Sequence, residues 1–395
     1  MPRKKTEINS ALLEKLKESL IENAGVRLKR SVDCDKLAET VSNKTSTYIN
    51  GISFKRLLGF TKYPFNPSIQ TLDIICQFLG FDNWYSFEQY HSNNVMISKK
   101  EFEIYSACFD IDFVNDVEPH EGAFQSVSRK IALRFREDPN TFIRHLPELM
   151  KKNQFQIFFA EHFTDYDNLC SYYYQVYESY LQHKKTPEAQ LFGNSMLFLK
   201  SFWIMDKQDC SKYLNEINKI NIDYHIHPYL IGRYYANILL YDAFYNDSKQ
   251  FSEIYNNYLK LRTKLPKDGK HFYDFPASEY IVSEALLHCK QFDKCIEIID
   301  FAKSEFTLKM EFVRKGYYRH LQLIWLLASK KINPNLNIDS QLEKISPINF
   351  YFISQKYFST LYHYAKGSPQ DLEKAKELAG EIGNQYLLEV FLNEC

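Results

Sequence analysis

Residues 368–380, SPQDLEKAKELAG, contain the signals of one complete α-helix and decide the fold class of this chain. Ser368 and Pro369 are typical of a helix start, because a serine side chain caps backbone N–H groups and proline fits the first helical position. The apolar residues that follow recur at spacings of three and four, and Gly380 is typical of a helix end. The stretch therefore predicts an amphipathic helix.

The same plan recurs toward the N-terminus, where a proline repeatedly begins a long, aromatic-rich stretch of helical spacing. These prolines are Pro187, Pro228, Pro276 and Pro347. Their spacings of 41, 48 and 71 residues fit helical-hairpin repeats, the last being close to two units. One hairpin cannot bury both its faces alone, so we expect an α-solenoid of stacked hairpins over residues 137–395.

The composition supports an all-α fold. Only 12 glycines and 13 prolines occur in 395 residues, and apolar residues rarely alternate with polar ones as in a half-buried strand. A hydrophobic share of 45% with 25% charged residues excludes a mainly disordered chain. We expect a small N-terminal domain over 1–91, a connecting segment over 92–136, in which 109–113 could form a short strand, and a helical repeat domain over 137–395.

Charge and targeting signals point to a cytoplasmic protein. The 49 Lys and Arg balance the 49 Asp and Glu, so no global field attracts the chain to nucleic acid or to a membrane. The basic N-terminus is followed by an amphipathic stretch rather than by the apolar core of a signal peptide. No apolar run reaches the ~20 residues that cross a bilayer. The eight scattered cysteines form no CxxC pair and indicate reduced thiols.

The N-terminal domain contains a specific pattern. Residues 52–60 (ISFKRLLGF), 66–72 (NPSIQTL) and 78–84 (FLGFDNW) together resemble the phage-repressor-like helix-turn-helix pattern. The resemblance covers residues 33–88 and implies that a recognition helix near 53–58 enters the major groove of DNA. The polar stretch before this helix is longer than the tight turn of the common pattern.

Within that helix, Phe54, Leu57 and Leu58 are expected to anchor the core side, while polar residues face the DNA. Arg56 suits a bidentate contact to guanine, whereas the lysines suit phosphates. The 13 Lys and Arg against 10 Asp and Glu in residues 1–95 give only a mildly basic domain. The alternative is that these charges are ordinary solvated residues of a small helical domain. The expected DNA-contacting residues are Lys44, Ser53, Lys55, Arg56 and Lys62.

The repeat region resembles tetratricopeptide-type arrays, and the resemblance implies a surface that binds a protein or peptide. The tyrosine-rich run 172–180 cannot hide every ring on one helical face, and a second aromatic run surrounds residue 234. The alternative is that these rings pack against the preceding helix pair. The apolar stretch 384–392 could supply a self-complementary patch, so we expect a homodimer. The expected partner-binding residues are Tyr173, Tyr177, Arg233 and Tyr234.

Signals for catalysis or metal binding are weak. His225 and His227 lie two residues apart without a third ligand, and they fit the start of a helix better than a zinc site. His120 lacks the second histidine of a zinc-protease helix. Asp110 and Asp112 are accompanied by no histidine, lysine or glycine-rich loop. We therefore expect no catalytic residue, no metal and no cofactor.

These observations favour a DNA-binding transcriptional regulator with a helical-repeat domain that senses a ligand or dimerises. An alternative is a non-enzymatic scaffold or adaptor, whose N-terminal domain binds protein and whose array recruits partners. A third possibility is an enzyme with a site assembled from residues that lie far apart in the sequence.

Overall fold

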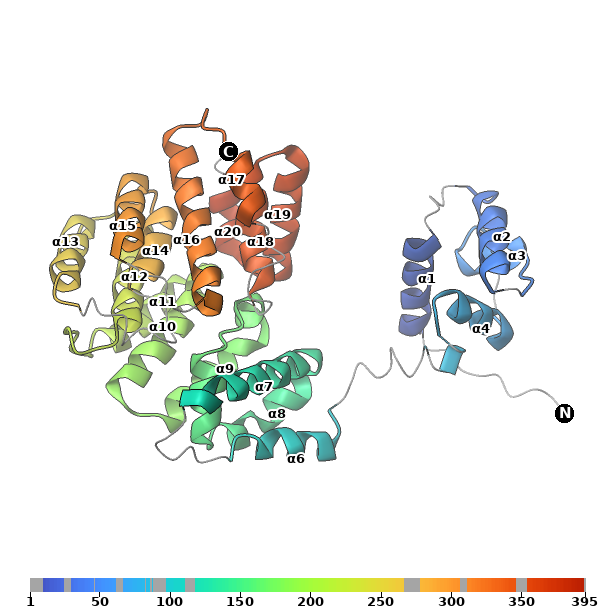
Figure 1. Cartoon of the computed structure of the whole chain (residues 1–395), viewed down its shortest axis with the longest axis horizontal. Helices are drawn as coiled ribbons and strands as arrows, with labels where there is room; N and C mark the ends of the chain where they lie inside the picture. The colour runs from blue at the N-terminus through green and yellow to red at the C-terminus, as the bar shows by residue number, and fades with distance from the viewer. Residues whose placement is uncertain are drawn as a thin grey trace. The chain divides into compact units, whose positions relative to one another are not determined.

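The computed structural model of the chain describes residues 10–24, 30–45, 47–61, 67–81, 83–85, 87, 97–110, 118–265, 278–305, 311–345 and 354–393. All regular secondary structure in these residues is helical, so the expected all-α class is confirmed. The chain divides into two compact units, residues 1–98 and residues 99–395 (Figure 1). None of the described helices combines the length and the apolarity that crossing a membrane requires.

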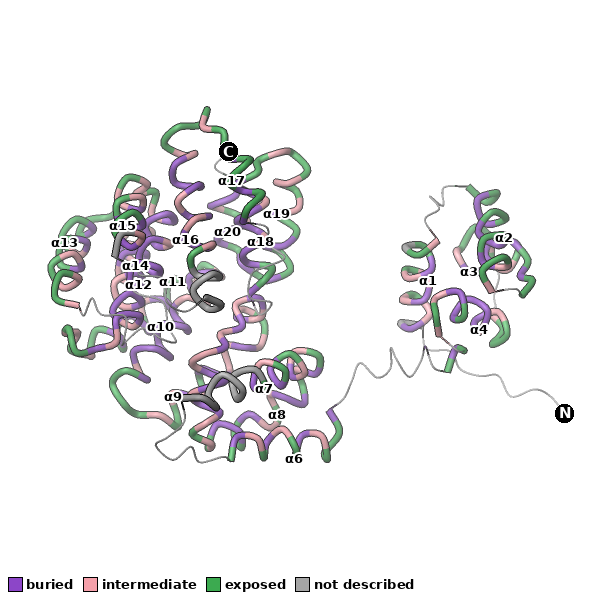
Figure 2. The backbone as a smooth tube through the Cα atoms, viewed as in Figure 1, coloured by how far each residue is buried: buried purple, intermediate pink, exposed green. Residues whose placement is uncertain are grey.

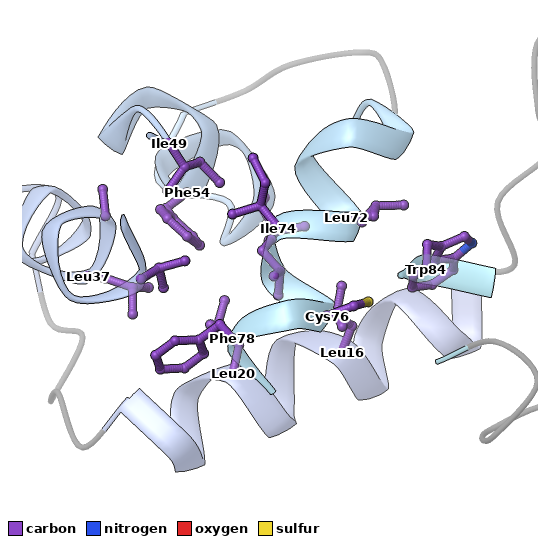
Figure 3. Close-up of a cluster of buried hydrophobic side chains, with 14 of the residues drawn as sticks. Leu16, Leu20, Leu37, Ile49, Phe54, Leu72, Ile74, Cys76, Phe78 and Trp84 are labelled. Atoms are coloured by element: carbon purple, nitrogen blue, oxygen red, sulfur yellow. The ribbon is translucent and has the colours of Figure 1, made fainter. Parts of the chain in front are cut away.

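The first unit surrounds one hydrophobic core. Its helices are α1 (Ser10–Ala24), α2 (Asp33–Thr45), α3 (Gly51–Leu57) and α4 (Ile69–Phe78). Figure 3 shows side chains from all four helices, among them Leu16, Leu37, Phe54 and Ile74, directed toward this core. Trp84 and Phe87 are buried against it.

Two glycines end helices of this unit. Gly59 follows α3 with a φ of 80°, and Gly80 follows α4 with a φ of 92°. Glycine adopts this left-handed backbone without the steric cost that a Cβ would bring.

The second unit is built mainly from α-helices, with π-helical turns in η1 and η3 and 3-10 turns in η2, η5 and η7. In chain order its elements are α6 (Lys99–Ala107), α7 (Glu118–Glu137), α8 (Pro139–Leu149), η1 (Phe155–Glu161), η2 (Tyr166–Asn168), η3 (Leu169–Tyr173), α9 (Tyr174–His183), α10 (Pro187–Trp203), α11 (Lys207–Ile217), α12 (Pro228–Tyr245), α13 (Phe251–Arg262), α14 (Ser278–His288), α15 (Phe292–Glu305), α16 (Glu311–Ile332), α17 (Asp339–Leu342), η5 (Glu343–Ile345), α18 (Gln355–Lys366), α19 (Pro369–Glu381), α20 (Gln385–Glu389) and η7 (Phe391–Asn393).

Local signals set the helix starts. α10, α12 and α19 each begin at a proline, and the residue before it caps the helix: Thr186, His227 and Ser368 accept hydrogen bonds from backbone N–H groups of the first turn. The predicted starts at Pro276 and Pro347 lie outside the described residues. The predicted end of α19 at Gly380 is wrong, because the helix continues to Glu381 and the chain turns at Gly383, with a φ of 68°.

The hairpins form a row whose two ends meet. Along the row, α10, α12, α14, α16 and α18 each contact the next, and α11, α13, α15 and α19 pack against their own hairpin partners. Figure 2 shows buried residues along α10, α12 and α14 and exposed residues on α13. At the end of the row, α18 contacts η2 and α20 contacts α10. The row therefore returns to its own beginning, a closure that the expectation of stacked hairpins did not include.

A side chain far away in the sequence caps α18 and fixes this closure. Asp167 in η2 accepts hydrogen bonds from the backbone N–H groups of Lys356 and Tyr357, at 3.2 and 3.1 Å. These groups lie in the first turn of α18, where backbone N–H groups have no partner within the helix.

The connecting segment expected over 92–136 requires correction. It contains α6 and α7, which belong to the second unit, and α7 packs against α8 and η1. Arg134 Nε in α7 lies 2.7 Å from Glu101 Oε1 in α6, and buried Phe102 and Phe135 supply apolar contacts. These helices were not identified from the sequence, although Ile131 and Phe135 recur at a helical spacing in α7. Residues 111–113 of the alternative strand lie outside the described residues.

Candidate functional site

Helix α3, the expected recognition helix, is held tightly against α2. The Asn50 side chain accepts a hydrogen bond from Ile52 N at 2.9 Å and caps the helix start. A Cβ at Gly51 would lie 2.0 Å from Asp35 Oδ1 and 3.1 Å from Asp35 Cα in α2, so a larger residue would force the Asp35 side chain to shift. Phe54 and Leu57 are buried in the core, as expected, and Leu58 packs against it.

The residues that were expected to contact DNA differ in exposure and in pairing. Arg56 is exposed on α3, and Ser53 is half-buried beside it. Lys55 is paired with Asp35, with 2.8 Å between Nζ and Oδ2, so an acidic group already neutralises its charge. Lys44 is exposed near the end of α2, with Nζ 4.6 Å from the centre of the Phe78 ring. Lys62 lies outside the described residues.

Two large apolar residues at the start of α3 are exposed to solvent. Tyr48 precedes α3 and is 81% exposed, and Ile52 in its first turn is 49% exposed. Large apolar side chains that stay exposed beside polar residues are typical of a binding surface. We define the α3 surface as Tyr48, Ile52, Ser53 and Arg56.

The expected partner surface on the array is wrong for three of its four residues. Tyr173, Tyr177 and Arg233 are buried, and only Tyr234 remains partly exposed. The tyrosine hydroxyls donate to neighbouring groups instead: Tyr173 to the Phe163 carbonyl at 2.6 Å, and Tyr177 to Thr164 Oγ1 at 3.0 Å. The tyrosines therefore pack within the array, which was the alternative considered from the sequence.

The C-terminal stretch is also unsuitable as the expected self-complementary patch. Tyr386, Leu387, Phe391 and Leu392 are buried. The Tyr386 hydroxyl donates to the His288 carbonyl at 3.3 Å, and its ring packs on Phe202 with centroids 4.6 Å apart. These apolar side chains stabilise the closed row and leave no exposed patch of their own.

His227 has a structural role, as the sequence indicates. Its Nδ1 accepts a hydrogen bond from Tyr229 N at 3.2 Å at the start of α12. Within the described part of the chain, no group of three or more His, Cys, Asp or Glu residues is arranged to hold a metal ion.

A buried polar cluster in the second unit is the site that the sequence did not reveal. It surrounds a cavity of about 40 Å³ whose lining includes Arg233 and Asn237 of α12, Glu284 and His288 of α14, His320 of α16 and Tyr357 of α18. We call these six residues the polar cluster. Most of the remaining lining is apolar or aromatic, including Phe202, Trp203 and Leu240.

Arg233 is the buried cation of the polar cluster. Its Nε and Nη2 donate to the Tyr229 hydroxyl at 3.1 and 2.7 Å, and Nη2 also donates to the Tyr166 hydroxyl. Nearby hydroxyls and the Glu284 carboxyl raise the pKa of Arg233 further, against the effect of burial, so the guanidinium remains charged.

Glu284 and the two histidines have perturbed ionisation. Burial raises the pKa of Glu284, although a hydrogen bond from the Tyr357 hydroxyl and the charge of Arg233 oppose the shift. Burial lowers the pKa of His288 to about 3 and that of His320 well below its ordinary value. Both imidazoles are therefore neutral at pH 7, and the 3.6 Å approach of His320 Nε2 to Glu284 Oε1 is not an ion pair.

The only sequence signals for this cluster are single polar residues inside apolar helices. Glu284 and His288 lie four residues apart on α14, which places them on the same helical face. Nothing in the sequence shows that residues near 233, 320 and 357 converge on that face.

Comparisons with protein-family models, with curated proteins and with solved structures find no match to this chain.

Proposed function

We propose that this chain is a cytoplasmic DNA-binding transcriptional regulator whose second unit of helical hairpins senses a ligand or dimerises. The observation that carries the proposal is α3, which buries Phe54 and Leu57 while Arg56 remains exposed. A recognition helix needs this division, because one side must be anchored while the other side contacts base edges.

The contacts around α3 support a fixed orientation of that helix. The Asn50 cap, the close approach at Gly51 and the Asp35–Lys55 ion pair all hold α3 against α2. A fixed recognition helix loses less conformational entropy on binding than a mobile one would. In this proposal Arg56 contacts base edges, Ser53 supports it, and Lys44 contacts a phosphate.

A homodimer belongs to the same proposal. Helix-turn-helix proteins normally present two recognition helices about 34 Å apart, which matches one turn of DNA. With a mildly basic N-terminal region, a single copy has few phosphate contacts, so two copies are needed for tight binding.

An adaptor is the second candidate, and the exposed Tyr48 and Ile52 favour it. Apolar and aromatic side chains at the α3 surface suit a protein partner, and Lys55 is already neutralised by Asp35. Here the α3 surface would contact a protein rather than the major groove.

The test of the proposal is a salt titration of duplex binding by the full chain, using genomic fragments that include its own promoter. The regulator binds one fragment preferentially, and log K falls linearly with log salt because phosphate contacts release counterions. Absence of duplex binding at low salt would reject the regulator in favour of the adaptor.

A further inference from the structure

The polar cluster contains a buried positive charge without a carboxylate partner. Arg233 is 4% exposed, and among the described residues no Asp or Glu oxygen lies within ion-pair distance of its guanidinium. Its protein hydrogen bonds go to the hydroxyls of Tyr166 and Tyr229 and use Nε and Nη2. Glu284 is near enough to favour the charged guanidinium but does not contact it, so an anion in direct contact with Arg233 would stabilise this buried charge further.

Several other polar atoms of the cluster have no hydrogen-bond partner among the residues that the structure describes. They are Asn237 Nδ2, His288 Nδ1 and His320 Nε2, and each belongs to a residue no more than 5% exposed. An unsatisfied buried polar atom costs about 1–3 kcal/mol. Their location around one cavity shows a site that is built for a polar group rather than a defect of packing.

The size and lining of the cavity limit what this group can be. A volume of about 40 Å³ holds a molecule of a few non-hydrogen atoms, since one water-sized probe occupies about 11 Å³. Phe202, Leu240 and Ala285 in the lining suit a short apolar chain. Arg233 is the one cation of the lining, and Glu284 also lines the cavity, so a singly charged anion fits the site better than a doubly charged one.

We propose that this cavity binds a small carboxylate that carries a short apolar chain, with the carboxylate at Arg233. The planar guanidinium matches a carboxylate in shape and charge. Asn237 donates a further hydrogen bond to the carboxylate, and a neutral histidine, whose tautomer can adapt, donates another. The inference goes beyond DNA binding and stands without it, because every residue of the cavity lies in the second unit.

The test uses isothermal titration of the full chain with acetate, propionate and butyrate, with propionamide as the matched neutral molecule and inorganic phosphate as the competing anion. At least one carboxylate is expected to bind with a Kd between about 10 μM and 1 mM, as a small ligand allows. Propionamide and phosphate are expected to bind at least about tenfold more weakly. Equal binding of acid and amide, tighter binding of phosphate, or no heat with any acid would overturn the proposal.

Two variants localise the binding. Arg233→Gln is expected to weaken the binding of the carboxylate at least about tenfold. Asn237→Leu keeps the branched shape of the side chain and removes its donor, so it is expected to weaken binding several-fold even if Arg233→Gln does not fold. Asn257→Leu, at an exposed position of α13, is the control and should bind as the wild type does. Unchanged affinity in folded Asn237→Leu and Arg233→Gln would overturn the assignment of the cavity.

Discussion

Lys55 in α3 and Asp35 in α2 form an ion pair across twenty residues of sequence, with 2.8 Å between Nζ and Oδ2. The pair joins the two helices on which the proposed DNA contact depends. The pair also involves the lysine that was expected, from the sequence, to contact a DNA phosphate. Asp35 therefore competes with DNA for Lys55 in the regulator that we propose.

Asp35→Asn should strengthen the binding of the full chain to any duplex and make its salt dependence steeper. Lys55 then gains one phosphate contact, which adds about 0.9 to the slope of log K against log salt. The control is Glu39→Gln, which removes an exposed acidic charge of α2 that forms no ion pair with Lys55. A slope that changes equally in both variants would contradict a role for Lys55 at a phosphate.

Gly232→Ala should destabilise the second unit by about 1–3 kcal/mol, because overpacking forces the backbone to shift. A Cβ at this position would lie 2.7 Å from the carbonyl oxygen of Ser278, where α12 crosses the start of α14. Gly380→Ala is the matched control, since the nearest atom to its added Cβ is 4.0 Å away. Alanine there should stabilise α19 by about 0.5–1 kcal/mol. Urea unfolding followed by near-UV circular dichroism compares the two variants, and similar midpoints would contradict the packing described for α12 and α14.

Asp165 should make stability depend on pH in mildly acidic solution. Burial raises the pKa of this carboxyl to about 6, although Arg136 Nε lies 3.2 Å from Oδ2 and opposes the shift. The pKa in the unfolded chain is about 3.9, so between these values the folded state holds more protons than the unfolded state. Protonation of Asp165 therefore stabilises the folded state fully below about pH 4, and this stabilisation is lost as the pH rises through about 6.

Relative to Asp165→Asn, the free energy of unfolding of the wild type should thus fall by up to about 3 kcal/mol between pH 4 and pH 7. Thermal unfolding at several pH values measures the difference. Asp247→Asn, at an exposed position, is the control for the change in charge. A wild type that gains stability relative to Asp165→Asn over this range would show that the ion pair with Arg136 outweighs burial.

The full chain should be a homodimer, because two α3 helices are needed for tight binding in our proposal. Light scattering should give twice the 46.9 kDa of one chain. The dimer contact must lie outside the buried C-terminal residues Tyr386, Leu387, Phe391 and Leu392. If the protein has the mass of one chain both in the absence of DNA and when bound to a duplex, the homodimer is wrong.

Features that depend on neighbouring residues were predictable from the sequence. Pro187, Pro228 and Pro369 begin helices, and Gly59 and Gly80 end them, because capping and backbone preferences act over a few residues. The helical period also identified Phe54 and Leu57 as core residues of α3. These local signals were enough for the fold class.

Features that depend on closure of the hairpin row were not predictable. Charged residues are almost never fully buried, so Arg233 was assigned to a surface, whereas the structure places it in the polar cluster. Asp167 caps a helix that begins almost two hundred residues later, and no sequence pattern links the two. A single sequence does not show which distant residues meet when the row closes.

The most direct test of DNA recognition through α3 is equilibrium binding of the wild type and Arg56→Ala to a duplex selected from random sequences. Both proteins are also titrated with unselected duplexes, and Lys36→Ala, at an exposed position of α2, is the control. We expect Arg56→Ala to lose about 1–3 kcal/mol on the selected duplex, roughly five- to 150-fold, and little on the others. A wild type that selects no duplex, or an Arg56→Ala variant that binds the selected duplex as the wild type does, would contradict it.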